Sequence, residues 1–513
     1  MTLQNHATTI TPLDEYNREL LHNVHPSDWV NPTPVSLYDL VVIGAGTAGL
    51  VTAKGAGGLG LGLKVALIEK HLMGGDCLNV GCVPSKCLIR SSRAVAQMRD
   101  AKPLGVIPPD IIEIDFSTVM ARMRQVRTKI SPVDSAISAK QVGVDVFFGE
   151  ASFTSNNTIT VEGQKLKFKK AVITTGARAV KPQIQGLESA GYLTNETVFS
   201  LTELPSQLAV IGGGAIGCEL AQAFQRLGSQ VTLFHRRNHV LNKEDVEAAK
   251  IVQQALIKDG VRLVLNSQLL GVEKTTEGKL IHFSSNGKSE LITVDEILAS
   301  AGRQPNVELN LEAAGVSYDS KKGVIVNDNL QTSNSKIYAA GDICMNWKFT
   351  HAADAAARIA IKNTLFSPFG LGKSKLSDLV MPWVTYTNPE IARVGMSEEE
   401  AQAKGINCNT IKIDFEDVDR ALADGETEGF LKIIHKKGSD EILGATIVAT
   451  HAGEMISEVT TAIVHKIGLS KMSSVIHPYP TQAEAIKKAA DTYRRTLLTP
   501  NTKRLLGILT KFS

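Results

Sequence analysis

The stretch YDLVVIGAGTAGL, residues 38–50, joins an apolar run to closely spaced glycines. Tyr38 to Ile43 has the apolar, β-branched composition of a buried parallel strand. Gly44, Gly46 and Gly49 follow in the spacing G-x-G-x-x-G, which predicts a tight turn into a helix whose first amides bind a pyrophosphate. The stretch therefore predicts the start of a nucleotide-binding βαβ unit.

A carboxylate stands where such a unit contacts ribose. The next apolar run, KVALIEK, ends at Glu69, 20 residues beyond Gly49, so this side chain can accept hydrogen bonds from ribose hydroxyls. Between them, AKGAGGLGLGLK is unusually rich in glycine for a helix. Each helical glycine costs roughly 1 kcal/mol relative to alanine, so helix propensity does not explain this composition.

The same plan occurs again in SQLAVIGGGAIGCELAQAFQRLGSQVTLFHRR, residues 206–237. The spaced glycines of this copy are Gly212, Gly214 and Gly217. Two copies of one βαβ plan indicate two Rossmann-like dinucleotide-binding domains.

The second copy lacks an acid at the end of its second strand. His235 stands there, 23 residues after Gly212, and Arg236 and Arg237 follow it. No carboxylate is available to hold a free 2′-hydroxyl, and two guanidinium groups suit a 2′-phosphate. We therefore expect NADPH rather than NADH, with arginines that merely face solvent as the alternative.

Length and composition restrict the classes of protein that remain. The chain has 513 residues, 43% hydrophobic and 21% charged, with 55 basic against 52 acidic side chains. The balanced charge gives no sign of a nucleic-acid partner. No apolar stretch is long enough to predict a membrane span, and the N-terminus shows no signal pattern. Six cysteines in this length indicate a reducing compartment, so the expected location is the cytoplasm.

We expect an α/β protein in which an α+β C-terminal domain follows the two dinucleotide-binding domains. The N-terminal extension is expected to be a loosely packed tail with one short helix near residues 16–22. The basic, apolar end TKRLLGILTKFS is expected to form a terminal helix, with membrane-surface binding as the alternative. The predicted limits are 1–37 for the extension, 38–190 with 315–380 for the first nucleotide domain, 191–314 for the second, and 381–513 for the C-terminal domain.

Three of the six cysteines stand in GGDCLNVGCVPSKC, residues 74–87. Cys77 and Cys82 can come within the Cα distance of about 7 Å that a disulfide needs if a helix begins near Cys82. Such a helix start would also lower the pKa of Cys82, whereas Asp76 should raise the pKa of Cys77. The alternative is two buried, unpaired cysteines, and a zinc site is not expected without a second cysteine pair.

Together these motifs resemble the pyridine nucleotide–disulfide oxidoreductases, which include dihydrolipoamide dehydrogenase, glutathione reductase and mercuric reductase. The resemblance runs from about residue 38 to about residue 493. GGDCLNVGCVPSK resembles the family's redox-active disulfide motif. VITTGAR (172–178), SAGRQPN (300–306) and IYAAGDIC (337–344) resemble its later nucleotide-binding markers. A homodimer of FAD-containing subunits is what this resemblance implies.

The resemblance also implies roles for single residues. Cys77 would be the interchange thiol, Cys82 the thiol against the flavin, and Lys86 would pair with Glu219 near the flavin N5. The first glycine motif would bind FAD, with Asp342 on its ribityl chain, and the second would bind NADPH. The remaining residues that the resemblance adds to the cofactor-binding set are Lys86, Ala151, Thr175, Gly176 and Gly302.

The C-terminal motif distinguishes between members of the family. Disulfide-reducing members carry His-Pro-Thr-x-x-Glu, whereas this chain has HPYPTQAEAIKKAADTY, residues 477–493. Aligned on the threonine and glutamate, Tyr479 occupies the acid/base position five residues before Glu484, and His477 lies two residues earlier. The resemblance implies that Tyr479 and Glu484 complete the active site of the partner subunit. A tyrosine at this position is similar to mercuric reductase.

A phenol with a pKa near 10 is a poor proton shuttle for a released thiolate. A soft metal needs two thiolate ligands instead, so we expect Cys77 and Cys82 to bind Hg(II) transiently and reduce it to Hg(0). No cysteine follows Cys408, and we expect no N-terminal metal-binding domain of the mercuric reductase kind, so the ion would arrive as a small-thiol complex. The alternatives are a dihydrolipoamide dehydrogenase- or glutathione reductase-like disulfide reductase with His477 as the base, and a redox-sensing flavoprotein.

Overall fold

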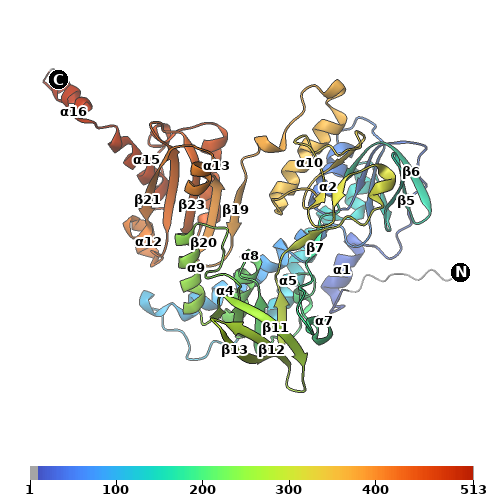
Figure 1. Cartoon of the computed structure of the whole chain (residues 1–513), viewed down its shortest axis with the longest axis horizontal. Coiled ribbons are helices and arrows are strands. Elements are labelled where there is room, and N and C mark those ends of the chain that lie inside the picture. Colours follow the sequence, from blue (N-terminus) through green and yellow to red (C-terminus); the bar gives the residue numbers. More distant parts are fainter. Residues whose placement is uncertain (1–9, 512–513) are drawn as a thin grey trace.

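The computed structural model describes residues 10–511 (Figure 1). Its first glycine motif joins strand β1 (Tyr38–Ile43) to helix α2 (Thr47–Gly57), and β2 (Val65–Glu69) then returns parallel to β1. This is the predicted βαβ unit. It belongs to a seven-stranded sheet in the order β3-β2-β1-β6-β5-β4, with β18 also paired to β6. The other strands are β3 (Val144–Phe148), β4 (Ser152–Ser155), β5 (Thr158–Val161), β6 (Gln164–Ile173) and β18 (Ile337–Ala339).

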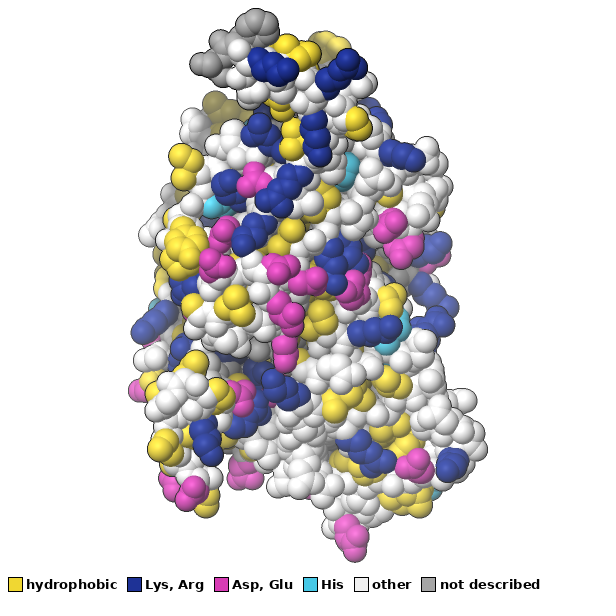
Figure 2. Space-filling view, turned by 90° about the vertical axis from the view of Figure 1, so that its left-hand side faces the viewer, with side chains coloured by type: hydrophobic (Ala, Val, Ile, Leu, Met, Phe, Trp, Pro, Cys, Tyr) yellow, Lys and Arg dark blue, Asp and Glu magenta, His cyan; other side chains and the backbone are white. Residues whose placement is uncertain are grey.

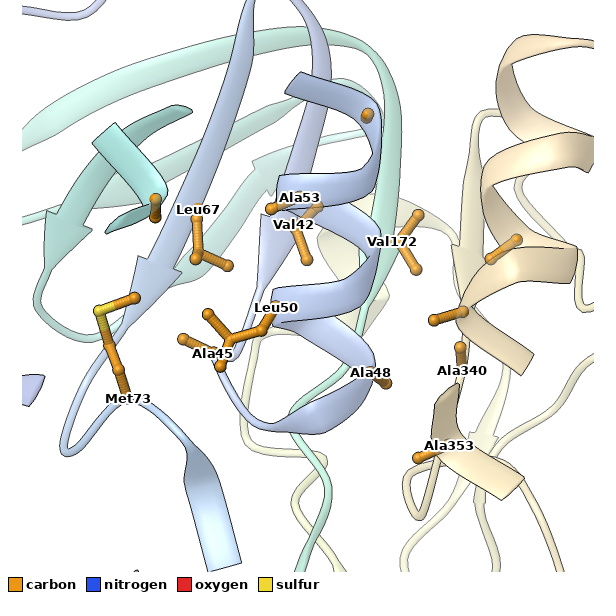
Figure 3. Packing of buried hydrophobic residues seen from close by; sticks show 14 of the residues in the cluster. Val42, Ala45, Ala48, Leu50, Ala53, Leu67, Met73, Val172, Ala340 and Ala353 are labelled. Atoms are coloured by element: carbon orange, nitrogen blue, oxygen red, sulfur yellow. The ribbon is translucent and has the colours of Figure 1, made fainter. Parts of the chain in front are cut away.

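Helix α2 is enclosed by packed structure, which accounts for its glycines. It lies between the sheet and α10 (Thr350–Leu365), with alanines on its surface (Figure 3). A Cβ at Gly55 would lie 2.9 Å from the side chain of Ile361, and one at Gly57 would lie 2.6 Å from the Val142 carbonyl oxygen. The glycines therefore permit close packing on two sides, at the expense of helix propensity.

The second glycine motif forms a separate parallel sheet in the order β10-β9-β8-β14. A three-stranded antiparallel sheet, β11-β12-β13, lies beside it in the chain. The elements are β8 (Gln207–Ile211), α8 (Ala215–Arg226), β9 (Gln230–Phe234), α9 (Val246–Lys258), β10 (Arg262–Val264), β11 (Ser267–Lys274), β12 (Lys279–Ser285), β13 (Lys288–Val294) and β14 (Glu296–Ala299).

An antiparallel ribbon joins the two nucleotide units. Strand β7 (Ala177–Ala179) pairs with β15 (Arg303–Pro305), so the segments VITTGAR and SAGRQPN lie side by side although about 130 residues separate them. After this ribbon the chain returns to the first sheet through β18. The limits proposed for the domains stay a prediction.

The N-terminal extension is tightly packed where it is described. Helix α1 (Glu15–Val24) contains the predicted segment 16–22, but its Leu20 and Val24 are fully buried. Asp14 at its N-cap pairs with Arg124 at 2.5 Å, and Asn17 binds Arg127. The expected loose packing is thus wrong for helix α1, whereas Val30, beyond it, is 85% exposed. Both arginines belong to helix α5 (Phe116–Ile130), more than a hundred residues away.

The C-terminal part is an antiparallel sheet with helices, as the α+β prediction required. Its strand order is β19-β20-β23-β22-β21, and residues of α13 (Ala452–Val464) and α15 (Glu484–Thr496) share its buried core. The strands are β19 (Pro382–Thr385), β20 (Glu390–Gly395), β21 (Cys408–Asp414), β22 (Phe430–Lys436) and β23 (Ile442–Ala449).

The chain ends in α16 (Pro500–Leu509), the expected terminal helix, which projects away from the body (Figure 1). Leu505 and Leu509 on it are more than half exposed. Lys and Arg side chains are prominent near this end of the molecule (Figure 2). Within residues 10–511, no helix is both long and apolar enough to cross a membrane.

Candidate active site

The first glycine turn is shaped for the backbone of a dinucleotide. Gly44 has φ +97°, and a Cβ on Gly49 would lie 1.7 Å from the Gly44 carbonyl oxygen. Glu69 is buried at the end of β2 and accepts a hydrogen bond from the Ala45 amide at 2.6 Å. Burial raises the pKa of Glu69. The turn thus leaves room for a pyrophosphate against bare backbone and keeps an acid at its edge.

The dithiol segment starts directly on this turn. Helix α3 (Gly75–Asn79) begins where a Cβ on Gly75 would lie only 2.7 Å from the Cα of Gly46. The contact explains why the cysteine motif follows a glycine-rich nucleotide pattern. A group bound on the turn lies next to the helix that carries Cys77.

Cys77 and Cys82 are both free thiols in this structure. Cys82 is the first residue of α4 (Cys82–Arg99), so the predicted helix start is confirmed. A hydrogen bond between the two thiols lowers the pKa of Cys82 to about 6 and raises the pKa of Cys77. The hydroxyl of Thr350 lies 3.2 Å from the Cys82 sulfur and also lowers its pKa. Cys82 is therefore the more acidic thiol of the pair.

Asp76, which the sequence left unexplained, forms an ion pair with Arg303. The Arg303 guanidinium also lies 3.4 Å from Asp342, so it bridges two carboxylates. We expected Asp76 to raise the pKa of Cys77. The pKa of Cys77 is raised, but by the hydrogen bond to Cys82 and by burial, and Asp76 is not among the main causes. Arg303 neutralises Asp76 instead. Arg303 stands in the marker SAGRQPN, yet it was absent from the predicted site.

The two nucleotide markers are bonded to each other. The Thr175 hydroxyl donates to the Asn306 carbonyl at 2.8 Å, and the Asn306 amide donates back to the Thr175 carbonyl at 2.8 Å. Gly176 and Gly302, on either side of the ribbon, have φ of +64° and +124°. Ala151 is buried just before β4. The structure therefore brings Thr175 and Gly176 close to the marker that contains Gly302.

Lys86 and Glu219 form an ion pair at 2.8 Å. The Lys86 ammonium lies 4.4 Å from the ring centroid of Tyr386, whose backbone amide donates to Glu219 at 2.8 Å. The predicted pair is thus present one helical turn beyond Cys82. Tyr386 and Thr350 were missed because each comes from a distant part of the chain.

The second glycine turn repeats the first. Gly212 has φ +114°, and a Cβ on Gly217 would lie 1.8 Å from the Gly212 carbonyl oxygen. Gly214 is the N-cap of α8. At its edge the Gly213 amide donates to Nδ1 of His235 at 3.1 Å. The second turn therefore has the same opening for a phosphate group.

His235 is neutral and can only donate from its remaining nitrogen. Burial lowers its pKa, and because Nδ1 accepts a hydrogen bond the proton is on Nε2. That buried Nε2 has no hydrogen-bond partner within the described chain. The side chains of Arg236 and Arg237 are exposed beside it. This edge therefore offers donors and cations rather than a carboxylate.

The C-terminal residues are placed away from the dithiol. Tyr479 is 70% exposed, and its hydroxyl donates to Asp419 at 2.9 Å. The His477 ring has only 5% of its side chain exposed and binds Glu458 at 2.9 Å. Glu484 has a buried carboxylate oxygen that finds no hydrogen-bond partner within residues 10–511. Among the hydrogen bonds and ion pairs of residues 10–511, none links these three residues to Cys77 or Cys82.

No group of three or more His, Cys, Asp or Glu side chains in the described part of the chain is placed to hold a metal ion. Residues 74–87 contain three cysteines. Cys77 and Cys82 are accessible to solvent, whereas Cys87 is buried. Any metal bound there would be held by two sulfurs.

Comparison with known proteins gives consistent results. Residues 38–357 match the family described as pyridine nucleotide-disulphide oxidoreductase, and residues 381–490 match its dimerisation domain. A mercuric reductase from Lysinibacillus sphaericus is 36% identical over 461 residues, covering 90% of this chain and 83% of the relative. A dihydrolipoyl dehydrogenase from Thermus scotoductus is 34% identical over 468 residues, covering 89% and 98%.

Two solved structures of similar proteins cover most of this chain. The HOCl-induced flavoprotein disulfide reductase RclA from Escherichia coli has a TM-score of 0.77 at 27% identity, covering 88% of this chain and 99% of its own. LpdA from Mycobacterium tuberculosis has a TM-score of 0.79 at 26% identity, covering 90% and 100%. RclA has also been solved as a Cu(II) complex.

Proposed function

This chain belongs to the pyridine nucleotide-disulphide oxidoreductase family, and from that premise we propose that it reduces thiol-bound Hg(II) to Hg(0) with electrons from NADPH. FAD and NAD(P)H are the cofactors of the family. Bound FAD supplies a two-electron carrier between nicotinamide and sulfur. Gly44, Gly46, Gly49 and Glu69 would hold its adenosine end, and Asp342 with Arg303 would lie along its chain.

The exposed phenol of Tyr479 is the observation that favours a metal ion over a disulfide as the acceptor. It stands where disulfide reductases have an acid/base histidine, while the ring of His477 is buried against Glu458. Hydrogen bonding to Asp419 raises the pKa of Tyr479 further, so protonation of a thiolate leaving group would be slow. Reduction of a metal ion needs no such proton.

The chain's own residues would perform the remaining steps. The Cys82 thiolate displaces one thiolate ligand from the incoming Hg(II) complex. Cys77 displaces the second and gives its proton to a released ligand, so that two Hg–S bonds form. Two electrons that originate from NADPH reduce the ion to Hg(0), which leaves, and NADPH becomes NADP⁺ and a proton. Because the pKa of Cys82 is lowered to about 6, the first Hg–S bond should not need a separate base.

We propose a homodimer in which Tyr479 and Glu484 reach the dithiol of the partner subunit. The match of residues 381–490 to the dimerisation domain supports this arrangement. Within one chain the Tyr479 hydroxyl binds Asp419, and no described hydrogen bond links it to the dithiol. The buried, unpartnered oxygen of Glu484 would be available to a group of the partner.

The test compares acceptors on the purified flavoprotein. NADPH oxidation should be stimulated by Hg(II) in excess 2-mercaptoethanol and much less by lipoamide or glutathione disulfide. Tyr479→Phe should lower the Hg(II) rate about 10- to 100-fold, the scale for groups around a metal site. Tyr318→Phe, which removes another hydroxyl bonded to a carboxylate, is the matched control. Turnover of disulfides without mercury stimulation would reject the proposal.

A disulfide reductase is the second candidate, because dihydrolipoyl dehydrogenases are nearly as similar as mercuric reductases. In that case His477→Ala should remove most activity and Tyr479→Phe should not. Cu(II) belongs in the same acceptor series, since a related reductase was solved with it. Very slow turnover with every acceptor would favour a redox sensor.

A further inference from the structure

The end of helix α1 contacts the segment that leads to Cys77. The Met73 amide donates to the Val24 carbonyl at 3.1 Å, and Nδ1 of His25 contacts the His71 carbonyl oxygen. Met73 and Val24 are fully buried. These contacts come directly before helix α3, so the N-terminal extension touches the chain just ahead of the helix that carries Cys77.

A buried arginine of α5 connects α1 to the other end of α3. One terminal nitrogen of Arg127 donates to the side-chain oxygen of Asn17, and the other donates to the Asn79 carbonyl at 2.7 Å. Asn17 is fully buried on α1, and Asn79 is the last residue of α3. Contacts that begin in the extension therefore hold α3 at both of its ends.

The position of Arg127 depends on these two acceptors. Only 4% of this residue is exposed, and it makes no ion pair among residues 10–511. Burial lowers the pKa of Arg127 to about 10. A buried cation is tolerated when its donors are satisfied. Removal of the Asn17 oxygen would leave one donor without an acceptor, so Arg127 would shift and loosen its bond to Asn79.

Helix α3 needs such contacts because it is too short to be stable alone. It has five residues, follows Gly74 with φ +86°, and has no side-chain cap. A helix of this length is marginal by itself in water. The Asn79 side chain donates to the carbonyls of Met73 and Gly75 at 3.0 and 2.9 Å, which ties the two ends of the segment together. Residues 71–79 should therefore shift as one unit when a contact at either end is lost.

We propose that α1 holds α3 in place and that Asn17, acting through Arg127, is a positioning residue for the thiol of Cys77. The contact keeps Cys77 within hydrogen-bonding distance of Cys82. This inference does not depend on which acceptor the dithiol reduces. It gives the N-terminal extension a role in the site, although the extension contributes no side chain to the dithiol itself.

The ionisation of Cys82 reports where Cys77 lies. The hydrogen bond with Cys77 is the largest cause of the lowered pKa of Cys82. The other groups that act on this pKa are Thr350, Lys86 and Glu219, which belong to α10, α4 and α8. None of them lies in residues 71–79. A shift of this segment should therefore raise the pKa of Cys82 toward that of an ordinary thiol.

The test measures the pH at which Cys82 ionises in the reduced flavoprotein. One equivalent of NADPH converts the disulfide form into one thiol and one thiolate, with release of NADP⁺. A thiolate beside an oxidised flavin absorbs at long wavelength, and this absorption is titrated with pH. In Asn17→Leu the midpoint should rise by about 1 on the pH scale, a roughly tenfold change in the ionisation constant.

Labelling with iodoacetamide gives a second reading of the same midpoint that does not depend on the flavin. The thiolate forms an S–C bond and iodide leaves, and mass spectrometry follows Cys77 and Cys82 separately. As the hydrogen bond between the thiols weakens, the midpoints of the two cysteines should approach each other.

Two further variants of α1 separate positioning from stability. Asn17→Asp keeps an oxygen that Arg127 can bind, so it should restore the wild-type midpoint. Asn23→Leu is the matched control, because the Asn23 side chain donates to the Ser131 hydroxyl at 2.9 Å and not to Arg127. It should leave the midpoint unchanged even where it lowers the Tm.

Arg127→Lys asks the same question if Asn17→Leu does not fold. It keeps a cation but offers one nitrogen in place of two, so its midpoint should also rise. The Tm and the FAD bound per chain are measured for each variant. A lowered Tm with a wild-type midpoint in these variants would mean that α1 only stabilises the fold, and would overturn the proposal. An equal shift in Asn23→Leu would overturn it as well.

Discussion

The two glycine turns have the same backbone construction but different side chains at the edge. In both, the third glycine of the motif would place its Cβ less than 2 Å from the carbonyl oxygen of the first. In both, a hydroxyl donates to that same carbonyl: Thr174 to Gly44 at 2.8 Å, and Ser300 to Gly212 at 3.0 Å. Backbone sterics and this shared side-chain hydrogen bond therefore account for the common shape of the two turns.

The two turns differ in the side chain that accepts a hydrogen bond from the amide after the first glycine. Glu69 does so with a carboxylate and His235 with Nδ1 of a neutral ring. Glu69 keeps further lone pairs for hydroxyl donors, whereas His235 can only offer an N–H. We propose that this strand-end position, together with Arg236 and Arg237 beside His235, sets whether the turn prefers a ribose diol or an anionic 2′-phosphate.

The largest expected effect separates the two turns completely. Gly49→Ala should give a protein with little bound flavin, because the added Cβ meets the Gly44 carbonyl. Gly217→Ala should remain yellow but bind NADPH about 100-fold more weakly, on the scale of about 3 kcal/mol for an overpacked site. Flavin absorbance per chain and NADPH titration measure the two effects.

Gly507→Ala is the control for this pair, since a Cβ there meets nothing within 4 Å. A colourless Gly217→Ala protein, or a yellow Gly49→Ala protein with normal affinity for FAD, would break the assignment of FAD to the first turn and NADPH to the second.

A smaller effect should follow when the residues at the edge of the second turn are replaced by the acid found at the first. His235→Glu combined with Arg236→Gln and Arg237→Gln should lower the NADPH-to-NADH ratio of kcat/KM by about 10- to 100-fold, the range for losing charge-assisted hydrogen bonds. Steady-state kinetics with both nucleotides measures it. Lys274→Gln removes an exposed charge from the same unit and should leave the ratio alone. An unaltered ratio in the triple variant would mean that the arginines only face solvent.

The smallest effect concerns pH, and the two edges should respond with opposite signs. Burial raises the pKa of Glu69 above 4.5, so the wild type loses stability as pH rises past that value. Burial lowers the pKa of His235 below 6.5, so the wild type loses stability as pH falls past that value.

In the ligand-free protein, Glu69→Gln should therefore gain Tm relative to the wild type toward high pH, and His235→Gln toward low pH. Shifts of about 1–2 °C are expected for a fraction of a kcal/mol. Thermal unfolding between pH 4.5 and 7.5 measures them. Parallel slopes for the two variants would contradict the difference in charge between the edges.

Local features of the site were readable from the sequence. The strand 38–43, the acid at Glu69 and the helix start at Cys82 agree with the structure. Each depends on spacing within a segment of about 30 residues. The ion pair of Lys86 with Glu219 came from the family resemblance rather than from spacing.

Contacts between distant segments were not readable in this way. Arg303 reaches Asp76 across 227 positions, and Thr350 reaches Cys82 across 268. The prediction of a loose N-terminal extension failed for the same reason, because the partners of Asp14 and Asn17 lie on α5. The periodicity of one segment does not indicate which side chain of a distant segment will contact it.

From the linear order of its residues alone, this protein's family, its two nucleotide turns and its reactive cysteine pair could be inferred. Glycine sterics and strand or helix periodicity act over a few residues, so they produce patterns that can be recognised in the sequence. The neutralisation of Asp76 by Arg303 and the contribution of Thr350 to the lowered pKa of Cys82 emerge once separate segments pack. They depend on burial and on charges brought within a few ångströms, which are properties of the assembled fold.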